Sequence, residues 1–144
     1  MKSFTRRLLL ALPLPYFVTA AKADDDRDPV NRPLDTSMLW HRTELYFGTG
    51  RPNGLPVSDI QFSQFVDQQV TPRFPDGLTL LAGYGQFKGS SGVINKEKSF
   101  LLILFYAPEM KDAGKLIEQI RATYKTMFSQ ESVLRADSQN LVSF

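Results

Sequence analysis

The stretch Phe100-Leu101-Leu102-Ile103-Leu104-Phe105-Tyr106 decides how this chain of 144 residues folds. Every side chain in it is apolar or aromatic, so both alternating sets of the stretch are suited to burial. A strand with one wet face alternates between apolar and polar residues, whereas a strand covered on both faces reads as a continuous apolar run. The stretch therefore predicts the central strand of a sheet that is covered on both faces.

One helix is expected before this strand in the sequence and one after it. The first begins at Ser58, which forms a capping-box pair with Gln61. It ends near Thr71, because Pro72 disfavours helical geometry in the residue before it. The second begins near Asp112. Its apolar spacing predicts one buried face made of Leu116, Ile120, Tyr124, Met127 and Phe128.

Three further strands are expected, over residues 39–47, 78–87 and 132–136, and the apolar run itself extends over about 98–106. A short pairing of residues 141–144 follows the last strand. Gly83 and Gly85 lie inside the second strand, where glycine predicts a bulge or a close approach by another group.

The order strand, helix, strand, strand, helix, strand predicts a ferredoxin-like α+β sandwich, an antiparallel sheet with two helices on one face. No third helix is available for the other face. A second subunit packed sheet to sheet, as in a dimeric α+β barrel, is the simplest cover. The alternative is that the leader, residues 24–38, or the C-terminal tail folds across the sheet. We favour a homodimer through the sheet face, because an exposed apolar patch of this size normally marks an association site.

The first 23 residues have the three parts of an export signal: a basic start with Arg6 and Arg7, an apolar run over 8–21, and a small-x-small cleavage site at 21–23. The run is too short for a permanent membrane anchor. We therefore expect removal of residues 1–23 and a periplasmic or extracellular protein. Export by the general secretory route is expected, and the twin-arginine route is the alternative, because the paired arginines fit its motif.

Two segments are expected after the signal. Residues 24–38 are rich in charge and proline and predict a flexible leader. Residues 39–144 predict a single ferredoxin-like domain, because 121 residues after cleavage suffice for one domain with an ordinary core.

Charge and composition exclude several classes of function. Removing the signal takes four of the 17 basic residues and leaves 13 against 15 acidic ones, so the net charge changes from +2 to −2. A chain this close to neutral gives no electrostatic reason to expect nucleic acid as a partner. Cysteine is absent, which excludes disulfides and thiolate metal sites. His41 is the only histidine, too few ligands for a zinc, copper or haem site, so we expect no cofactor.

Four blocks of the sequence resemble a known family: Trp40–Gly48, Val70–Thr79, Gly85–Phe87 and Gln130–Arg135. The family is the bacterial domain of unknown function 3574, and the likeness runs from about Trp40 to Phe144. Its members are mostly short exported proteins, so the resemblance implies export. It implies no activity and assigns no catalytic residue.

Alternation along the first strand places Trp40, Arg42, Glu44 and Tyr46 on one face of the sheet. Arg42 is suited to orient an anion, Glu44 to act as a base and Tyr46 to donate a hydrogen bond. Structural pairing of Arg42 with Glu44 is the plain alternative.

Three residues from other strands are expected to reach the same region. Tyr84 and Gln86 would contribute from the second strand, and Arg135 at the entry to the last strand would approach Glu44 or Arg42. These six residues form the candidate pocket, and the catalytic residues stay unknown.

Three functions remain open at this point. The first, which we favour, is a module that binds a small molecule, with its pocket between sheet and helices or at the dimer seam. The second is an enzyme without a cofactor, of the isomerase or oxygenase type found among dimeric α+β barrels, using Glu44, Arg42 or Tyr84. The third is a protein-interaction module that uses the apolar sheet face.

Overall fold

The computed structural model describes residues 37–88 and 92–144. The predicted export signal and nearly all of the predicted leader lie outside these residues. The elements are β1 (Met38–Gly48), α1 (Asp59–Phe65), the π-helix η2 (Val66–Val70), β2 (Thr79–Lys88), β3 (Ile94–Tyr106), α2 (Ala113–Phe128) and β4 (Leu134–Val142). Among the described residues, no helix is long and apolar enough to cross a membrane.

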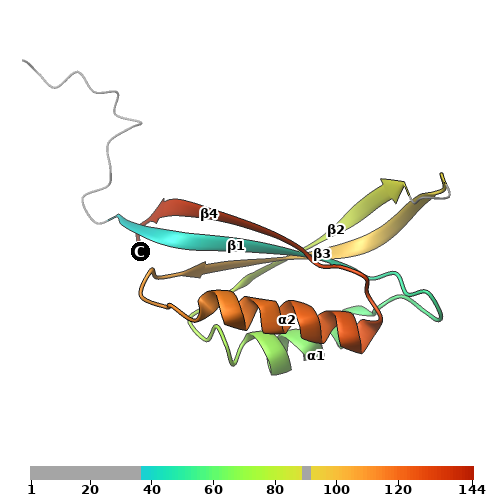
Figure 1. Cartoon of the computed structure of the whole chain (residues 1–144), viewed down its shortest axis with the longest axis horizontal. Helices are drawn as coiled ribbons and strands as arrows, with labels where there is room; N and C mark the ends of the chain where they lie inside the picture. Colours follow the sequence, from blue (N-terminus) through green and yellow to red (C-terminus); the bar gives the residue numbers. More distant parts are fainter. Residues whose placement is uncertain (1–36, 89–91) are drawn as a thin grey trace, which may run out of the picture. The chain divides into compact units, whose positions relative to one another are not determined.

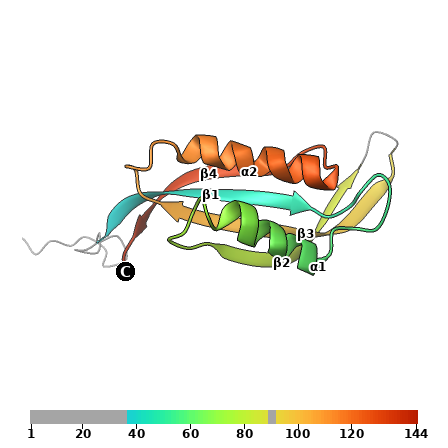
Figure 2. The same cartoon turned by 90° about the horizontal axis from the view of Figure 1, so that it is seen from below.

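The four strands form one antiparallel sheet in the order β2-β3-β1-β4. Both helices cover the same face of this sheet (Figures 1 and 2). This is the ferredoxin-like α+β arrangement, so the predicted fold class is confirmed. The apolar run lies in β3, between β2 and β1, at the central position that its composition predicts.

The strand register assigns each side chain to one of two faces. Leu45 of β1 lies opposite Leu102 of β3, and both are buried beneath the helices. Glu44 lies opposite Ile103 on the other face. We call this other face the open face. Its members are Trp40, Arg42, Glu44 and Tyr46 of β1, Leu101, Ile103 and Phe105 of β3, Thr79 and Leu81 of β2, and Leu134, Ala136, Ser138 and Asn140 of β4.

The core between sheet and helices is built around Phe47 of β1. Its ring lies 4.6 Å from that of Tyr124 on α2 and 5.4 Å from that of Phe62 on α1, measured between centroids. Phe62 in turn stacks on Phe100 of β3 at 3.9 Å. These rings join both helices to the two central strands, and their edge-to-face contacts favour one arrangement of the layers.

The first helix begins as its sequence predicts. The Gln61 N–H donates to Ser58 Oγ at 3.2 Å, and the Ser58 N–H donates to Gln61 Oε1 at 3.1 Å, which completes the capping box. The helical segment also stops near Thr71. The sequence does not predict that the last turn of this helical segment widens into the π-helix η2. In η2 the Thr71 N–H donates to the Val66 carbonyl oxygen at 3.0 Å, and both Val66 and Val70 are buried.

The buried face of α2 differs from the prediction. Ala113 and Ile117 are fully buried with Ile120, Tyr124 and Phe128, whereas Met127 is half exposed. Leu116 lies only at the margin of the core. Adjacent apolar residues at 116–117 and 127–128 permit two stripes, and packing against the sheet selects the one that includes the small side chain of Ala113.

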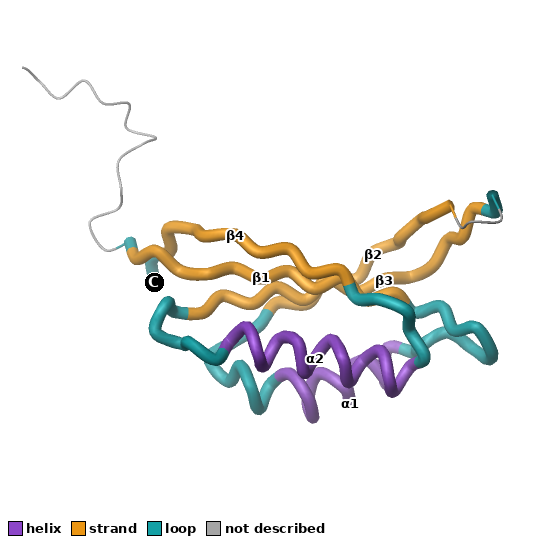
Figure 3. The backbone as a smooth tube through the Cα atoms, in the orientation of Figure 1, coloured by secondary structure: helices purple, strands orange, loops and turns teal. Residues whose placement is uncertain are grey.

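Two strands are longer than expected. β3 begins at Ile94 rather than near residue 98, so β2 and β3 continue as a two-stranded arm beyond the helices (Figure 3). β4 is one continuous strand of nine residues rather than two short segments. β1 begins at Met38, one residue inside the predicted leader.

The glycines of β2 do not mark a bulge, so that prediction is wrong. Pairing with β3 is continuous through Gly83 and Gly85. A Cβ atom built at either glycine would meet only Ser99, at 3.8–3.9 Å, which is ordinary contact. Gly83 and Gly85 share the open face with Leu81. Because glycine has no side chain, the backbone of the arm is bare on that face at these two positions.

Candidate ligand-binding site on the open sheet face

Three of the predicted site residues lie together on the open face. Arg42 Nη2 donates to Glu44 Oε1, and the Tyr46 hydroxyl donates to Glu44 Oε2 at 2.5 Å. The hydrogen bond to Glu44 raises the pKa of Tyr46, because ionising the phenol would remove the donor and place two negative charges side by side. Both carboxylate oxygens of Glu44 therefore already accept a hydrogen bond from a neighbour on the same strand.

Arg42 also contacts an aromatic side chain of the neighbouring strand on the open face. Its guanidinium carbon lies 5.6 Å from the centre of the Phe105 ring, a cation–π distance. Its Nε is shielded from solvent and has no hydrogen-bond partner among the described residues. The structural pairing of Arg42 with Glu44 is thus present, and one polar atom of Arg42 remains unsatisfied.

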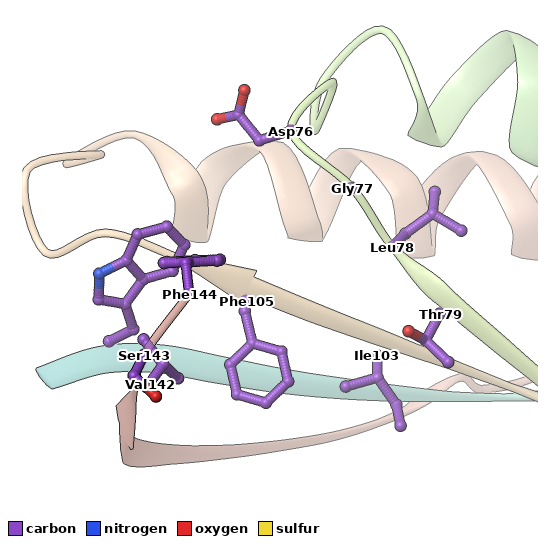
Figure 4. Close-up of a pocket in the computed structure, with 10 residues that line it drawn as sticks. Asp76, Gly77, Leu78, Thr79, Ile103, Phe105, Val142, Ser143 and Phe144 are labelled. Carbon is purple, nitrogen blue, oxygen red and sulfur yellow. The ribbon is translucent and has the colours of Figure 1, made fainter. Parts of the chain in front are cut away.

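A pocket of about 490 Å³ opens beside Phe105, at the end of the sheet where β1 begins and β3 ends. Its lining includes Trp40, Asp76, Leu78, Ile103, Phe105 and Phe144. The Trp40 and Phe144 rings meet edge to face at 5.2 Å. Figure 4 shows the Phe105 ring and Phe144 on one side of the pocket and the Asp76 carboxylate and Leu78 on another. The pocket thus combines aromatic walls with one carboxylate at its rim.

The sequence did not point to the residues that complete this pocket. The sequence predicts only a place in the central strand for Phe105 and a terminal pairing for Phe144. Alternation groups Leu101 with Phe105 on one face of β3, but only the register of β3 against β1 puts that face on the same side as Arg42. Asp76 and Phe144 carry no such signal, because a turn and the chain end bring them here.

Two predicted site residues do not join the open face. Tyr84 lies opposite Lys98 and Gln86 opposite Lys96, so both project from the arm toward the helix side. Tyr84 is 92% exposed. The expectation that they extend the Arg42 row is wrong, because the register of β2 against β3 reverses their face.

Arg135 also lies on the helix side, opposite Leu45 rather than beside Glu44. Its Nε donates to both oxygens of Asp137, at 2.9 and 3.0 Å, and its Nη1 donates to Glu118 of α2 at 2.9 Å. Asp137 also accepts a hydrogen bond of 2.6 Å from Thr43 Oγ1. We call Thr43, Tyr106, Glu118, Arg135 and Asp137 the helix-side cluster.

The helix-side cluster joins three strands to α2. The Thr43 and Tyr106 hydroxyl groups lie 3.0 Å apart, and the His41 ring stacks on Tyr106 with centroids 5.5 Å apart. A second pocket of about 360 Å³ is lined by His41, Tyr106, Arg135 and Asp137. Because the Asp137 oxygens and the Thr43 hydroxyl are engaged with one another, the cluster is best explained as a structural tie.

The cluster predicts an acid-sensitive contribution to stability. Burial works against the charged form of Asp137, but hydrogen bonds from Thr43 and Arg135 outweigh it and lower the pKa of this carboxyl. The stabilisation is therefore present above the ordinary aspartate pKa of about 3.9 and is lost as the pH falls through the lower folded-state value. Asp137→Asn should flatten the fall in unfolding free energy between neutral and acid pH by up to about 1 kcal/mol, since the side chain is half exposed.

Urea unfolding at a series of pH values measures this effect. Asp67→Asn, at an exposed position of η2, is the matched control. If the free energy of unfolding falls as steeply toward acid pH in Asp137→Asn as in the unaltered protein, the role given to Asp137 is contradicted.

Within residues 37–88 and 92–144, no group of three or more histidine, aspartate or glutamate side chains is placed to hold a metal ion. The fold is that of a small ferredoxin-like α+β protein, and a pocket with aromatic lining lies on its open sheet face. The chain belongs to the family described as "Protein of unknown function (DUF3574)", whose sequence model matches residues 42–144. No curated protein matches the chain.

Solved structures support the fold assignment. A phage SAM lyase in complex with S-methyl-5'-thioadenosine is similar at a TM-score of 0.53 and 14% sequence identity, covering 73% of this chain and 90% of the lyase. The lyase in its apo state gives the same TM-score and identity, with 72% and 84% covered. At this identity the likeness concerns the fold alone.

Proposed function

We propose that this protein binds a small planar molecule in the pocket on the open face. The observation that carries the proposal is the meeting of three aromatic side chains, Trp40, Phe105 and Phe144, around one cavity of about 490 Å³. A cavity of this volume falls within the range of small-molecule sites, which are mostly apolar with a few oriented polar groups.

The lining indicates how such a ligand would be held. An aromatic ring placed among these side chains gains offset or edge-to-face contacts, each worth about 0.5–1.5 kcal/mol beyond the buried area. The Asp76 carboxylate at the rim accepts a hydrogen bond from an amine or hydroxyl of the ligand. The favoured ligand is therefore a planar ring that carries a hydrogen-bond donor.

The phage enzyme suggests a first probe. Its structure holds S-methyl-5'-thioadenosine, which has a planar purine ring with an exocyclic amine and ribose hydroxyl groups. These are the chemical features that the pocket favours. The probe is chosen for its chemistry, and no lyase activity is proposed for this chain.

A fluorescence titration tests the proposal, because Trp40 is the only tryptophan of the chain and lines the pocket. The protein used begins at Asp24, the residue after the predicted export signal. Saturable quenching or a shift of the Trp40 emission is expected with S-methyl-5'-thioadenosine or with another member of a panel of planar amines and phenols.

Phe105→Ala should then raise the dissociation constant of the bound compound about tenfold, the loss of roughly one ring contact. Ile60→Ala is the matched control, because Ile60 is an exposed apolar residue on α1, on the far side of the sheet. The proposal fails if no planar compound of the panel changes the emission, or if Phe105→Ala and Ile60→Ala bind equally well.

A further inference from the structure

The open face carries apolar side chains that nothing in the described part of the chain covers. Leu81 is 52% exposed, and Tyr46, Phe105 and Leu134 are exposed as well. Figures 1 and 2 show both helices on the opposite side of the sheet. The C-terminal residue Phe144 reaches only one corner of the face, where its ring meets Trp40. Soluble proteins rarely leave a contiguous patch of this kind without a partner.

We infer that a second copy of this chain covers the open face, packed sheet to sheet about a two-fold axis. The charges at the centre of the face support this occupant. Arg42 and Glu44 lie two residues apart on β1, near its middle, and form an ion pair. A two-fold axis that crosses β1 at Thr43, at right angles to the strand and parallel to the sheet, reverses the strand direction in the second copy. Arg42 of each copy then lies opposite Glu44 of the other, so the charges of the face are complementary to themselves.

The size of the face allows a small dimer interface. β1 has 11 residues, so at about 3.3 Å per residue it is roughly 36 Å long. Four strands lie side by side only at Glu44–Tyr46, because β4 pairs with β1 over Met38–Tyr46 and β2 is level only with Glu44–Gly48. With strands about 4.8 Å apart, the part of the face level with β1 measures roughly 500 Å². That area is near the 600 Å² or so that each partner buries in the smallest standard interfaces.

The same axis has a consequence for the pocket. Leu81 lies opposite Leu101, which lies opposite Tyr46, three positions beyond Thr43 toward the arm. The two-fold operation places Leu81 of the partner copy three positions from Thr43 in the opposite direction along the strands. That position lies over the edge of the sheet where Gly77 and Asp76 line the pocket. Leu81 of the partner copy then closes the pocket. This closure rests on the proposed ligand site, whereas the dimer itself does not.

Light scattering after size-exclusion chromatography tests the dimer without any ligand. The protein beginning at Asp24 should have the mass of two chains at micromolar concentration. Leu81→Lys should raise the dissociation constant about a hundredfold, a tenfold loss for each of the two copies of the residue. Ile60→Lys, at a position 71% exposed on α1, should leave the dimer intact. Circular dichroism checks that both variants stay folded.

A charge exchange supplies a second, independent test. Arg42→Glu places four carboxylates at the centre of the interface and should weaken the dimer, and the double variant Arg42→Glu/Glu44→Arg should restore it, because the reversed pattern is again self-complementary. A protein of one chain at 100 µM or so, a trimer, or equal dissociation of the two lysine variants would overturn the inference. A dimer whose Trp40 emission no compound changes would overturn only the ligand proposal.

Discussion

Phe47→Ala is expected to lower the free energy of unfolding by about 3–5 kcal/mol, the largest stability loss predicted for this protein. Phe47 is fully buried, and its ring contacts those of Phe62, Phe65 and Tyr124. Removing it leaves a cavity between β1 and both helices that these rings cannot fill without leaving their own contacts. Because small domains are stable by only about 5–15 kcal/mol, the variant is expected to unfold at much lower urea concentration.

Urea denaturation followed by far-ultraviolet circular dichroism measures this loss. Phe87→Ala is the matched control, since Phe87 is 55% exposed on the arm, and its effect should stay within about 0.5 kcal/mol. Similar losses for the two variants would show that the core is not centred on Phe47.

Thr43→Val is expected to lower the free energy of unfolding by about 1–3 kcal/mol, although the two side chains have nearly the same shape. Thr43 is fully buried, and its hydroxyl donates to Asp137 and lies within hydrogen-bond distance of the Tyr106 hydroxyl. Valine removes the bridging group and leaves both partners facing an apolar methyl.

A double-mutant cycle with Tyr106→Phe separates this network from packing. The combined loss should be smaller than the sum of the single losses, because the two hydroxyls act together. Thr126→Val, at an exposed position of α2, is the control and should change stability by less than about 0.5 kcal/mol. Additive losses at Thr43 and Tyr106 would contradict the bridging role.

The element order and the central strand could be predicted because each has a local cause. A capping box at Ser58 and Gln61, and a proline after Thr71, determine where the first helix begins and ends. The apolar run in β3 has no polar alternation, so its place between two strands follows from its composition.

The candidate site was predicted only within one strand. Alternation along β1 correctly places Arg42, Glu44 and Tyr46 on one face, because neighbours two apart share a face whatever the strand pairs with. The faces of Arg135 and Tyr84 depend on the register between strands, which shifts every side chain to the opposite face when it changes by one residue. Sequence patterns did not determine that register.

The pairing of β1 with β4 has a consequence for how the chain acquires its structure. Thr43 and Asp137 are bonded across 94 positions of sequence, so the first strand gains its second neighbour only when the final segment has been made. Contacts so distant along the chain slow folding, since a long loop must close before they form. A nascent chain that ends before Leu134 leaves the backbone edge of β1 bare, and such edges recruit strands from other chains. Pairing with β4 therefore covers the edge of β1 and makes β4 the edge strand of the finished sheet.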